Sequence, residues 1–305
     1  MTKRSKEFKG ILFAFLLLAL GLSAKQQETL LRLSGPYLGQ KPPGMTPEIF
    51  APGVISTADH EYGIAFSKDL REIFLKRASG GKGKDIVYTR RNTIWQGPED
   101  VAFDPAGTYG QLQVTSDGEH LLANRITTDK DGNSVSTIVL FVRKNGVWTN
   151  PQPIGAGMRA TSTDSGTIYV THIPDPQKRF GLIGRYQLRD GKYEGPEVLD
   201  EAVNHGNFSS AHPFIAPDES YLIFDSRREE DKRDGLYISF REDGRSWSPA
   251  ASLSKALQTG ADARDWYATV SPDGQYLFFS SSSEGSPSDI YWVSAKILEG
   301  LRPKK

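Results

Sequence analysis

The segment Trp266–Ser280 reads WYATVSPDGQYLFFS, and DIYWV follows at Asp289–Val293. Runs of aromatic and β-branched residues alternate with a Ser-Pro-Asp-Gly turn and a longer polar loop. In such a turn proline fixes φ, the aspartate side chain accepts a backbone N–H two residues on, and glycine supplies a positive φ. The segment therefore predicts three short antiparallel strands joined by a tight turn and a loop.

Related segments recur upstream. The copy at His212–Ser226 matches best, and weaker copies lie at Ile64–Leu75, Leu112–Leu122 and Ala160–Val170. The turn aspartates that we assign to the five units are Asp69, Asp117, Asp164, Asp218 and Asp273. They recur roughly every 50 residues, a period that favours a β-propeller.

A second recurring element supplies one more strand to each unit. It appears at Tyr88–Trp95, Phe141–Trp148, Tyr186–Tyr193 and Phe240–Trp247, and each copy is followed within a few residues by proline. Asn-Gly or Asp-Gly between apolar runs is a hairpin signal, and it occurs in three of the four copies. Proline suits an outer strand, where a missing N–H costs least. We therefore expect four strands per blade.

The fifth unit has no such outer strand, because the sequence ends soon after Leu298. The apolar, proline-bearing segment Pro47–Ser56 precedes the first unit and could replace it. We expect this segment to pair with the last blade and close the ring, which hides free sheet edges. The predicted fold is an all-β propeller of about five four-stranded blades; a sixth blade would need a unit within residues 25–60, where no copy of the turn is found.

The N-terminus has the pattern of a secretory signal peptide. Lys3, Arg4, Lys6 and Lys9 precede the apolar run Ile11–Leu22 and the small residues Ser23 and Ala24. The run is shorter than the about 20 residues that span a bilayer. We expect residues 1–24 to be a signal peptide, 25–46 an irregular lead-in and 47–305 one propeller domain, exported to the periplasm or secreted. An uncleaved anchor is the alternative, and no later membrane span is expected.

Composition excludes several classes of site. Lys and Arg together number 37, as do Asp and Glu, so the formal net charge is zero and nothing indicates a nucleic-acid partner. The chain has no cysteine, which excludes disulfides, thiolate metal ligands and cysteine nucleophiles. No G-x-S-x-G nucleophile elbow or H-E-x-x-H zinc motif is present.

The repeats resemble the WD-repeat-like propeller repeats of the TolB type, over roughly residues 47–298, with 212–226 and 266–293 the best copies. The resemblance implies the propeller fold and is weak for activity. Such propellers are often periplasmic, and they serve as protein-binding scaffolds or accompany hydrolases and lyases. Because no second domain is apparent here, the resemblance favours binding over catalysis.

In a propeller, residues at the start of each innermost strand and at the end of the second strand gather on one face. The residues that we predict there, as candidate ligand-binding residues, are His60, Glu61, Tyr62, Arg77, Tyr109, Arg125, Arg159, His172, His212, Arg227, Asp265 and Trp266. Cationic, carboxylate and aromatic groups together suit a polar or anionic ligand, such as a peptide terminus or an acidic sugar. For each single residue, a structural role within the blades is the competing interpretation.

We expect a non-catalytic scaffold, a monomer without cofactor, that recognises a protein, peptide or glycan. We assign no catalytic residue and no metal ligand, although His172, His205 and His212 could meet near one blade junction. The alternative is a small exported hydrolase or lyase acting on a glycan or peptide at the same face. A hydrogen-bonded His–carboxylate pair in a deep pocket would favour this alternative.

Overall fold

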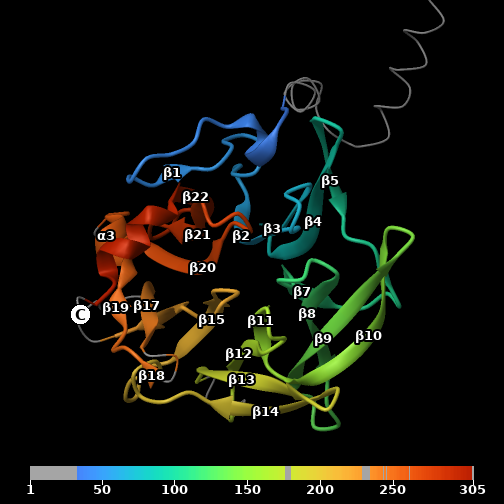
Figure 1. Cartoon of the computed structure of the whole chain (residues 1–305). Coiled ribbons are helices and arrows are strands. Elements are labelled where there is room, and N and C mark those ends of the chain that lie inside the picture. The colour runs from blue at the N-terminus through green and yellow to red at the C-terminus, as the bar shows by residue number, and fades with distance from the viewer. Residues whose placement is uncertain are drawn as a thin grey trace, which may run out of the picture.

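The computed structural model describes residues 33–175, 180–228, 234–242, 244, 246–260 and 262–303. The predicted signal peptide and the first residues of the lead-in lie outside this part of the chain. Five small antiparallel sheets are arranged around a common axis, as a five-bladed β-propeller (Figure 1). The prediction of five blades is thus confirmed. No helix of the described residues is both long and apolar enough to cross a membrane.

The blades follow one another along the chain, each from its innermost to its outermost strand. Blade 1 contains β2 (His60–Phe66), β3 (Glu72–Ser79), β4 (Lys82–Arg91) and β5 (Ile94–Asp100). Blade 2 contains β7 (Tyr109–Val114), β8 (His120–Thr128), β9 (Ser134–Lys144) and β10 (Val147–Ala156), with the short β6 (Phe103–Asp104) added parallel to β10. Blade 3 contains β11 (Met158–Ser162), β12 (Ile168–His172), β13 (Leu182–Arg189) and β14 (Lys192–Val198).

The last two blades depart from this pattern at their outer edges. Blade 4 contains β15 (Ser210–Ile215), β16 (Tyr221–Arg227) and β17 (Asp234–Glu242), and its outer strand is divided into β18 (Ser246–Trp247) and β19 (Ala251–Ser252). The short helix α3 (Leu253–Leu257) follows. Blade 5 contains β20 (Arg264–Val270), β21 (Tyr276–Ser282), β22 (Asp289–Ser294) and β1 (Glu48–Ile49). The 3-10 segments η2 (Pro36–Gly39) and η3 (Ala295–Leu301) lie outside the sheets.

Apolar residues fill every interface between neighbouring sheets. In β21, Leu277 and Phe279 pack toward blade 4, whereas Phe278 packs toward blade 1. Successive residues of a strand point to opposite faces, so a strand buried on both faces needs a continuous apolar run. This requirement explains the apolar run YLFF with which β21 begins at Tyr276. The tryptophans Trp95 and Trp148 of the outer strands are also buried between sheets.

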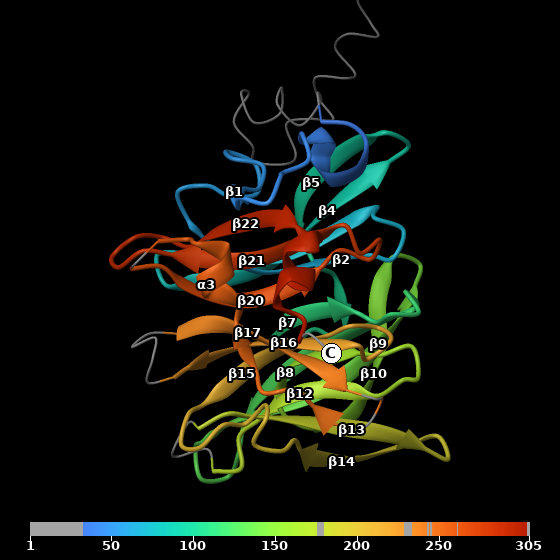
Figure 2. The same cartoon turned by 60° about the vertical axis from the view of Figure 1, so that its left-hand side comes forward.

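The ring is closed by the N-terminal segment, as the sequence predicts. Strand β1 pairs antiparallel with β22, and the two lie side by side in both Figure 1 and Figure 2. The Phe50 N–H donates to the Ile290 carbonyl at 2.8 Å, and the Phe50 ring lies 5.0 Å from that of Trp292. Ser56 extends the contact, since its hydroxyl donates to the Ile290 carbonyl and accepts the Ile290 N–H.

The turns between the first and second strands use the predicted aspartates, with one correction. Asp273 accepts the Ser271 hydroxyl at 2.7 Å and the Gln275 N–H at 3.1 Å, and Asp69, Asp117 and Asp218 likewise accept backbone N–H groups. In blade 3, however, Ser165 occupies this position and bonds to Thr163. Our assignment of Asp164 as the turn aspartate is therefore wrong by one residue, because a hydroxyl replaces the carboxylate there.

Candidate functional site

All twelve predicted residues lie at the same end of their blades. We call this end the strand-start face, because the innermost strands begin there and the second strands end there. Register supports the grouping, since Glu61 of β2 is paired with Arg77 of β3, and Tyr109 of β7 with Arg125 of β8. The others lie in or at the ends of the corresponding strands of blades 3, 4 and 5.

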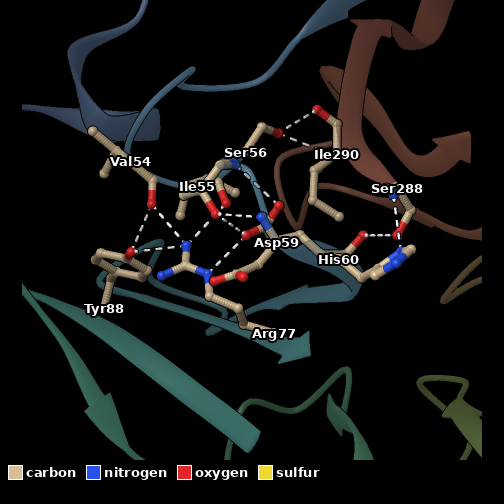
Figure 3. A network of polar contacts seen from close by, with 11 residues as sticks. Val54, Ile55, Ser56, Asp59, His60, Arg77, Tyr88, Ser288 and Ile290 are labelled. Carbon is tan, nitrogen blue, oxygen red and sulfur yellow. Dashed lines mark hydrogen bonds and ion pairs between the residues drawn. The ribbon is translucent and has the colours of Figure 1, made fainter. Parts of the chain in front are cut away.

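Glu61 and Arg77 are occupied in holding the closing segment. The Glu61 side chain is fully buried and accepts hydrogen bonds from Arg77 Nε at 2.8 Å and from the Thr57 N–H and hydroxyl. Arg77 Nη2 donates to the carbonyls of Val54 and Ile55 (Figure 3). A carboxylate and a guanidinium with these partners have little capacity left for a ligand.

Three further predicted residues are engaged in the same way. His60 Nδ1 accepts the Ser288 N–H at 3.2 Å, which ties β2 to the loop before β22 (Figure 3). The buried Asp265 carboxylate accepts the hydroxyls of Ser254, Thr259 and Ser281, and it thereby anchors the α3 loop. The buried Tyr109 donates its hydroxyl to the carbonyl of Pro105. For these residues the structural role is observed.

Other predicted residues remain accessible. Tyr62 and Trp266 are half-buried and Arg125 is exposed, and no side-chain hydrogen bond or ion pair of these three occurs within the described chain. Arg227 is exposed and lies 3.6 Å from the Asp234 carboxylate. His172 is partly buried at the end of β12, where burial lowers its pKa and its Nδ1 has no partner among the described residues.

A set of residues near the axis was not singled out as a group by sequence reasoning. Each innermost strand contains a β-bulge, and the first residue of each bulge has a positive φ. We call these residues the bulge ring; they are Gly63, Gln111, Arg159, His212 and Tyr267. Four of them are not glycine, and such conformations are strained for L-residues and concentrate at functional sites. Their spacing follows the repeat, but nothing in the local sequence indicates the bulge.

The bulge-ring side chains contact one another. His212 stacks on Tyr267 with ring centroids 3.9 Å apart, and Gln111 Nε2 donates to the Tyr267 hydroxyl at 2.7 Å. His212 Nδ1 lies 2.9 Å from a carboxylate oxygen of Asp225. Tyr62 extends the row of rings, 5.5 Å from Tyr267. The row therefore joins blades 1, 4 and 5 beneath the strand-start face.

Arg159 is the most unusual member of the ring. Its side chain is fully buried, its guanidinium carbon lies 5.4 Å from the Tyr267 ring centre, and its Nε and Nη2 have no hydrogen-bond partner in the described structure. Burial lowers the pKa of Arg159 to about 10, so the group stays protonated at neutral pH. The negative charges of Tyr267 and Asp225 when ionised oppose this shift. The charge thus belongs to the interior and does not reach the strand-start face.

Metal ligation finds no support in the described part of the chain. No group of three His, Asp or Glu side chains there is arranged to hold a metal ion. His212 bonds to Asp225 and stacks on Tyr267, whereas His205 is exposed and stacks on Phe208.

Comparison with known proteins supports the fold alone. No family model and no curated protein matches the chain. Among solved structures, the endo-arabinase from Bacteroides thetaiotaomicron VPI-5482 has a TM-score of 0.50 at 14% identity, over 82% of this chain and 95% of that one. TolB from Acinetobacter baumannii has a TM-score of 0.46 at 14% identity, over 77% of this chain and 54% of TolB. A GH43 protein from Bacillus licheniformis has a TM-score of 0.49 at 9% identity, over 82% of this chain and 57% of that one.

The chain therefore spans little more than half the length of two of these proteins. At 14% identity the endo-arabinase shows a shared fold only, and a shared fold does not choose between binding and catalysis. What is established is a five-bladed β-propeller with an internally bonded ring of side chains near its axis.

Proposed function

We propose that this chain is an exported, non-catalytic binding protein of the TolB-type repeat group, which recognises a protein, peptide or glycan at the strand-start face. The basic start and short apolar run of the N-terminus support export. The five repeat copies support the family assignment. The ligand site consists of the predicted residues that the fold leaves accessible, chiefly Tyr62, Arg125 and Trp266.

The observation that carries this proposal is how the predicted carboxylates of this face, and Asp225 beside His212, are occupied. Glu61 is bonded to Arg77, Asp265 to three hydroxyls and Asp225 to His212. Acid–base cleavage of a glycosidic bond generally needs two carboxyl groups that face the substrate. The accessible predicted groups are instead chiefly the rings of Tyr62 and Trp266 and the guanidinium groups of Arg125 and Arg227, which suit stacking and the recognition of a carboxylate without bond cleavage.

Binding of defined probes to the full chain tests the proposal. We would titrate uronic-acid oligosaccharides, their neutral counterparts and peptides with a free terminal carboxylate, using isothermal titration calorimetry. Arg125→Gln should weaken binding of the acidic probe about tenfold, equivalent to about 1.4 kcal/mol. Trp266→Ala should weaken binding of acidic and neutral sugars alike, whereas Lys192→Gln, an exposed change on blade 3, should have no effect. Unchanged affinity in both site variants would refute this site.

One observation favours catalysis as a second candidate function. The His212–Asp225 pair is hydrogen-bonded in the way that orients a general base, and the His212 side chain is 19% exposed. Turnover of a polysaccharide or peptide by the purified chain, abolished in His212→Gln while its unfolding curve is retained, would establish a hydrolase or lyase. Absence of turnover with all probes that bind would support the scaffold.

A further inference from the structure

A cavity lies at the other mouth of the propeller, which the proposed function does not use. Its volume is about 320 Å3, within the range of roughly 300–1,000 Å3 typical of small-molecule sites. It is lined where the innermost strands end, by residues such as Phe66, Gln113 and Phe214, and by the turns that follow them. We call it the turn-side cavity. All five blades contribute to it.

One position in each turn faces this cavity, and in two blades it carries a charge. The position is Lys68 in blade 1 and Asp164 in blade 3, and Ser116, Pro217 and Pro272 in the others. Both charged side chains are exposed, and neither forms a hydrogen bond or ion pair with any other described residue. The cavity therefore has one cationic and one anionic group, both available to a ligand.

The placement of these charges is built into the turns. A Cβ at Gly118 would lie 2.7 Å from Lys68 Cβ, so only glycine at 118 lets the Lys68 stem pass there. Asp164 is held through its backbone, because its N–H donates to the Pro217 carbonyl at 2.8 Å. Ser165 has taken over the turn-forming bonds, which leaves the neighbouring carboxylate unused.

The wall of the cavity contains one unsatisfied buried amide. Gln113 is 9% exposed, and its Oε1 has no hydrogen-bond partner in the described structure. A buried acceptor without a donor is unfavourable, so the Gln113 side chain would gain a hydrogen bond by turning its oxygen toward a ligand N–H in the cavity. The rings of Phe66, Phe214 and Tyr221 provide apolar surface in the lining of the cavity.

We propose that the turn-side cavity binds a short unblocked peptide, of two or three residues with apolar side chains. Asp164 receives its terminal ammonium group, Lys68 its terminal carboxylate, and Gln113 its peptide group. Charge-assisted hydrogen bonds at both ends give selectivity for molecules that carry both charges. The apolar side chains of the peptide lie against the aromatic wall.

A sugar fits these observations less well. The Thr161 hydroxyl bonds to the Pro213 carbonyl and the Ile215 N–H, and the Ser271 hydroxyl is bonded to Asp273. The Ser162 hydroxyl accepts the Ser116 N–H. The hydroxyl-rich lining is thus largely occupied, and few groups remain for the many hydroxyls of a saccharide.

Leucyl-leucine, its N-acetyl form and its C-terminal amide serve as probes, each titrated against the full chain by isothermal titration calorimetry. Acetylation removes the group that Asp164 would bind, so acetylation and Asp164→Asn should each weaken binding about tenfold. Combined, they should weaken it no further than either alone. Likewise, amidation and Lys68→Met should each weaken binding about tenfold, and the two combined should weaken it no further than either alone.

The controls are exposed charges that do not line the cavity, Arg71 in the turn of Lys68 and Glu119 in the corresponding turn of blade 2. Glu119→Gln and Arg71→Met should leave the affinity of the dipeptide unchanged, and unfolding curves check that every variant folds. Arg125→Gln, at the opposite mouth, should also leave it unchanged, which separates this site from the proposed function.

Equal affinity for free and capped dipeptides would overturn the proposal. So would a lack of saturation at millimolar dipeptide, or tighter binding of the neutral disaccharide maltose than of leucyl-leucine. Loss of affinity in the Asp164 variant that is as large for the acetylated as for the free dipeptide would also contradict it, because the carboxylate would then act on something other than the ammonium group.

Discussion

At one mouth of the propeller the Glu61 carboxylate is fully buried and bonded to Arg77 and Thr57, whereas at the other the Asp164 carboxylate is exposed and has no bonded partner in the described chain. The two mouths come from opposite ends of the same strands. The strand-start face has to hold the closing segment and the longer loops, and its polar groups are used for that. The turns at the other mouth are satisfied by local bonds, so the residue that faces the cavity is left free. A charged side chain at a propeller mouth therefore indicates a ligand only where that side chain has no bonding role within the fold.

Neutralising one carboxylate at each mouth tests this contrast most directly. Glu61→Gln breaks a largely buried ion pair and should lower the free energy of unfolding by about 3 kcal/mol, since the half-buried Arg77 loses its carboxylate partner. Asp164→Asn should change it by less than about 0.5 kcal/mol. Urea unfolding followed by tryptophan fluorescence measures both. Similar values for the two variants would remove the distinction between the mouths.

The bulge ring that separates the mouths gives the next largest effect. Gly63 has a φ of 68°, and a Cβ there would meet Arg159 Nη1 at an ordinary 3.6 Å. Gly63→Ala should therefore cost about 1–2 kcal/mol through backbone strain alone. Gly110 in the next blade has no positive φ and also has room for a Cβ, so Gly110→Ala is the control and should not destabilise. Equal costs would mean that packing, not backbone conformation, limits this ring.

A smaller effect separates two aspartates of the turn side. Asp273 accepts two hydrogen bonds within its turn, whereas Asp164 accepts none from the described residues. Asp273→Ala should lower the free energy of unfolding by about 1 kcal/mol, the usual net value of such bonds. Asp164→Ala should leave it nearly unchanged. A cost at Asp164 as large as at Asp273 would show that its carboxylate supports the turn after all.

The smallest predicted effect is a pH dependence from the strand-start face. Burial lowers the pKa of His172, so the unfolded chain binds a proton more readily than the folded one. Stability should then fall as the pH drops below the ordinary histidine value of about 6.5, until the folded-state pKa is passed. His172→Gln should flatten this part of the profile, and His205→Gln, at an exposed histidine, should not. The measurement is the free energy of unfolding at several pH values from about 7.5 to about 5, on both sides of the ordinary histidine pKa.

The sequence predicts the architecture well because each blade repeats its own turn and edge signals. The tight turns with aspartate, the aromatic residue at the start of the outer strands, and the closing role of Pro47–Ser56 all rest on local chemistry. The error at Asp164 arose because Ser165 can form the same turn bonds as aspartate, so a search for aspartate alone selects the neighbouring residue.

The site is predictable only in outline. Strand order places twelve residues on one face, but it does not reveal that the Asp265 and Glu61 carboxylates are bonded to hydroxyls and a guanidinium of the adjoining loops and strands. The bulge ring is hidden for another reason. Gln111, Arg159 and Tyr267 give no local signal for a positive φ, which tertiary packing imposes on them.

The pairing of β1 with β22 also affects the order in which the blades can form during synthesis. The contact between Ser56 and Ile290 joins residues 234 positions apart, so this segment can pair only after the much later Ile290 has been synthesised. Blades 1 to 4 use hairpins between neighbouring strands and can form as the chain emerges. Blade 5 cannot, and a nascent or truncated chain that stops before β22 carries an orphan edge that could dock onto the β22 of another copy.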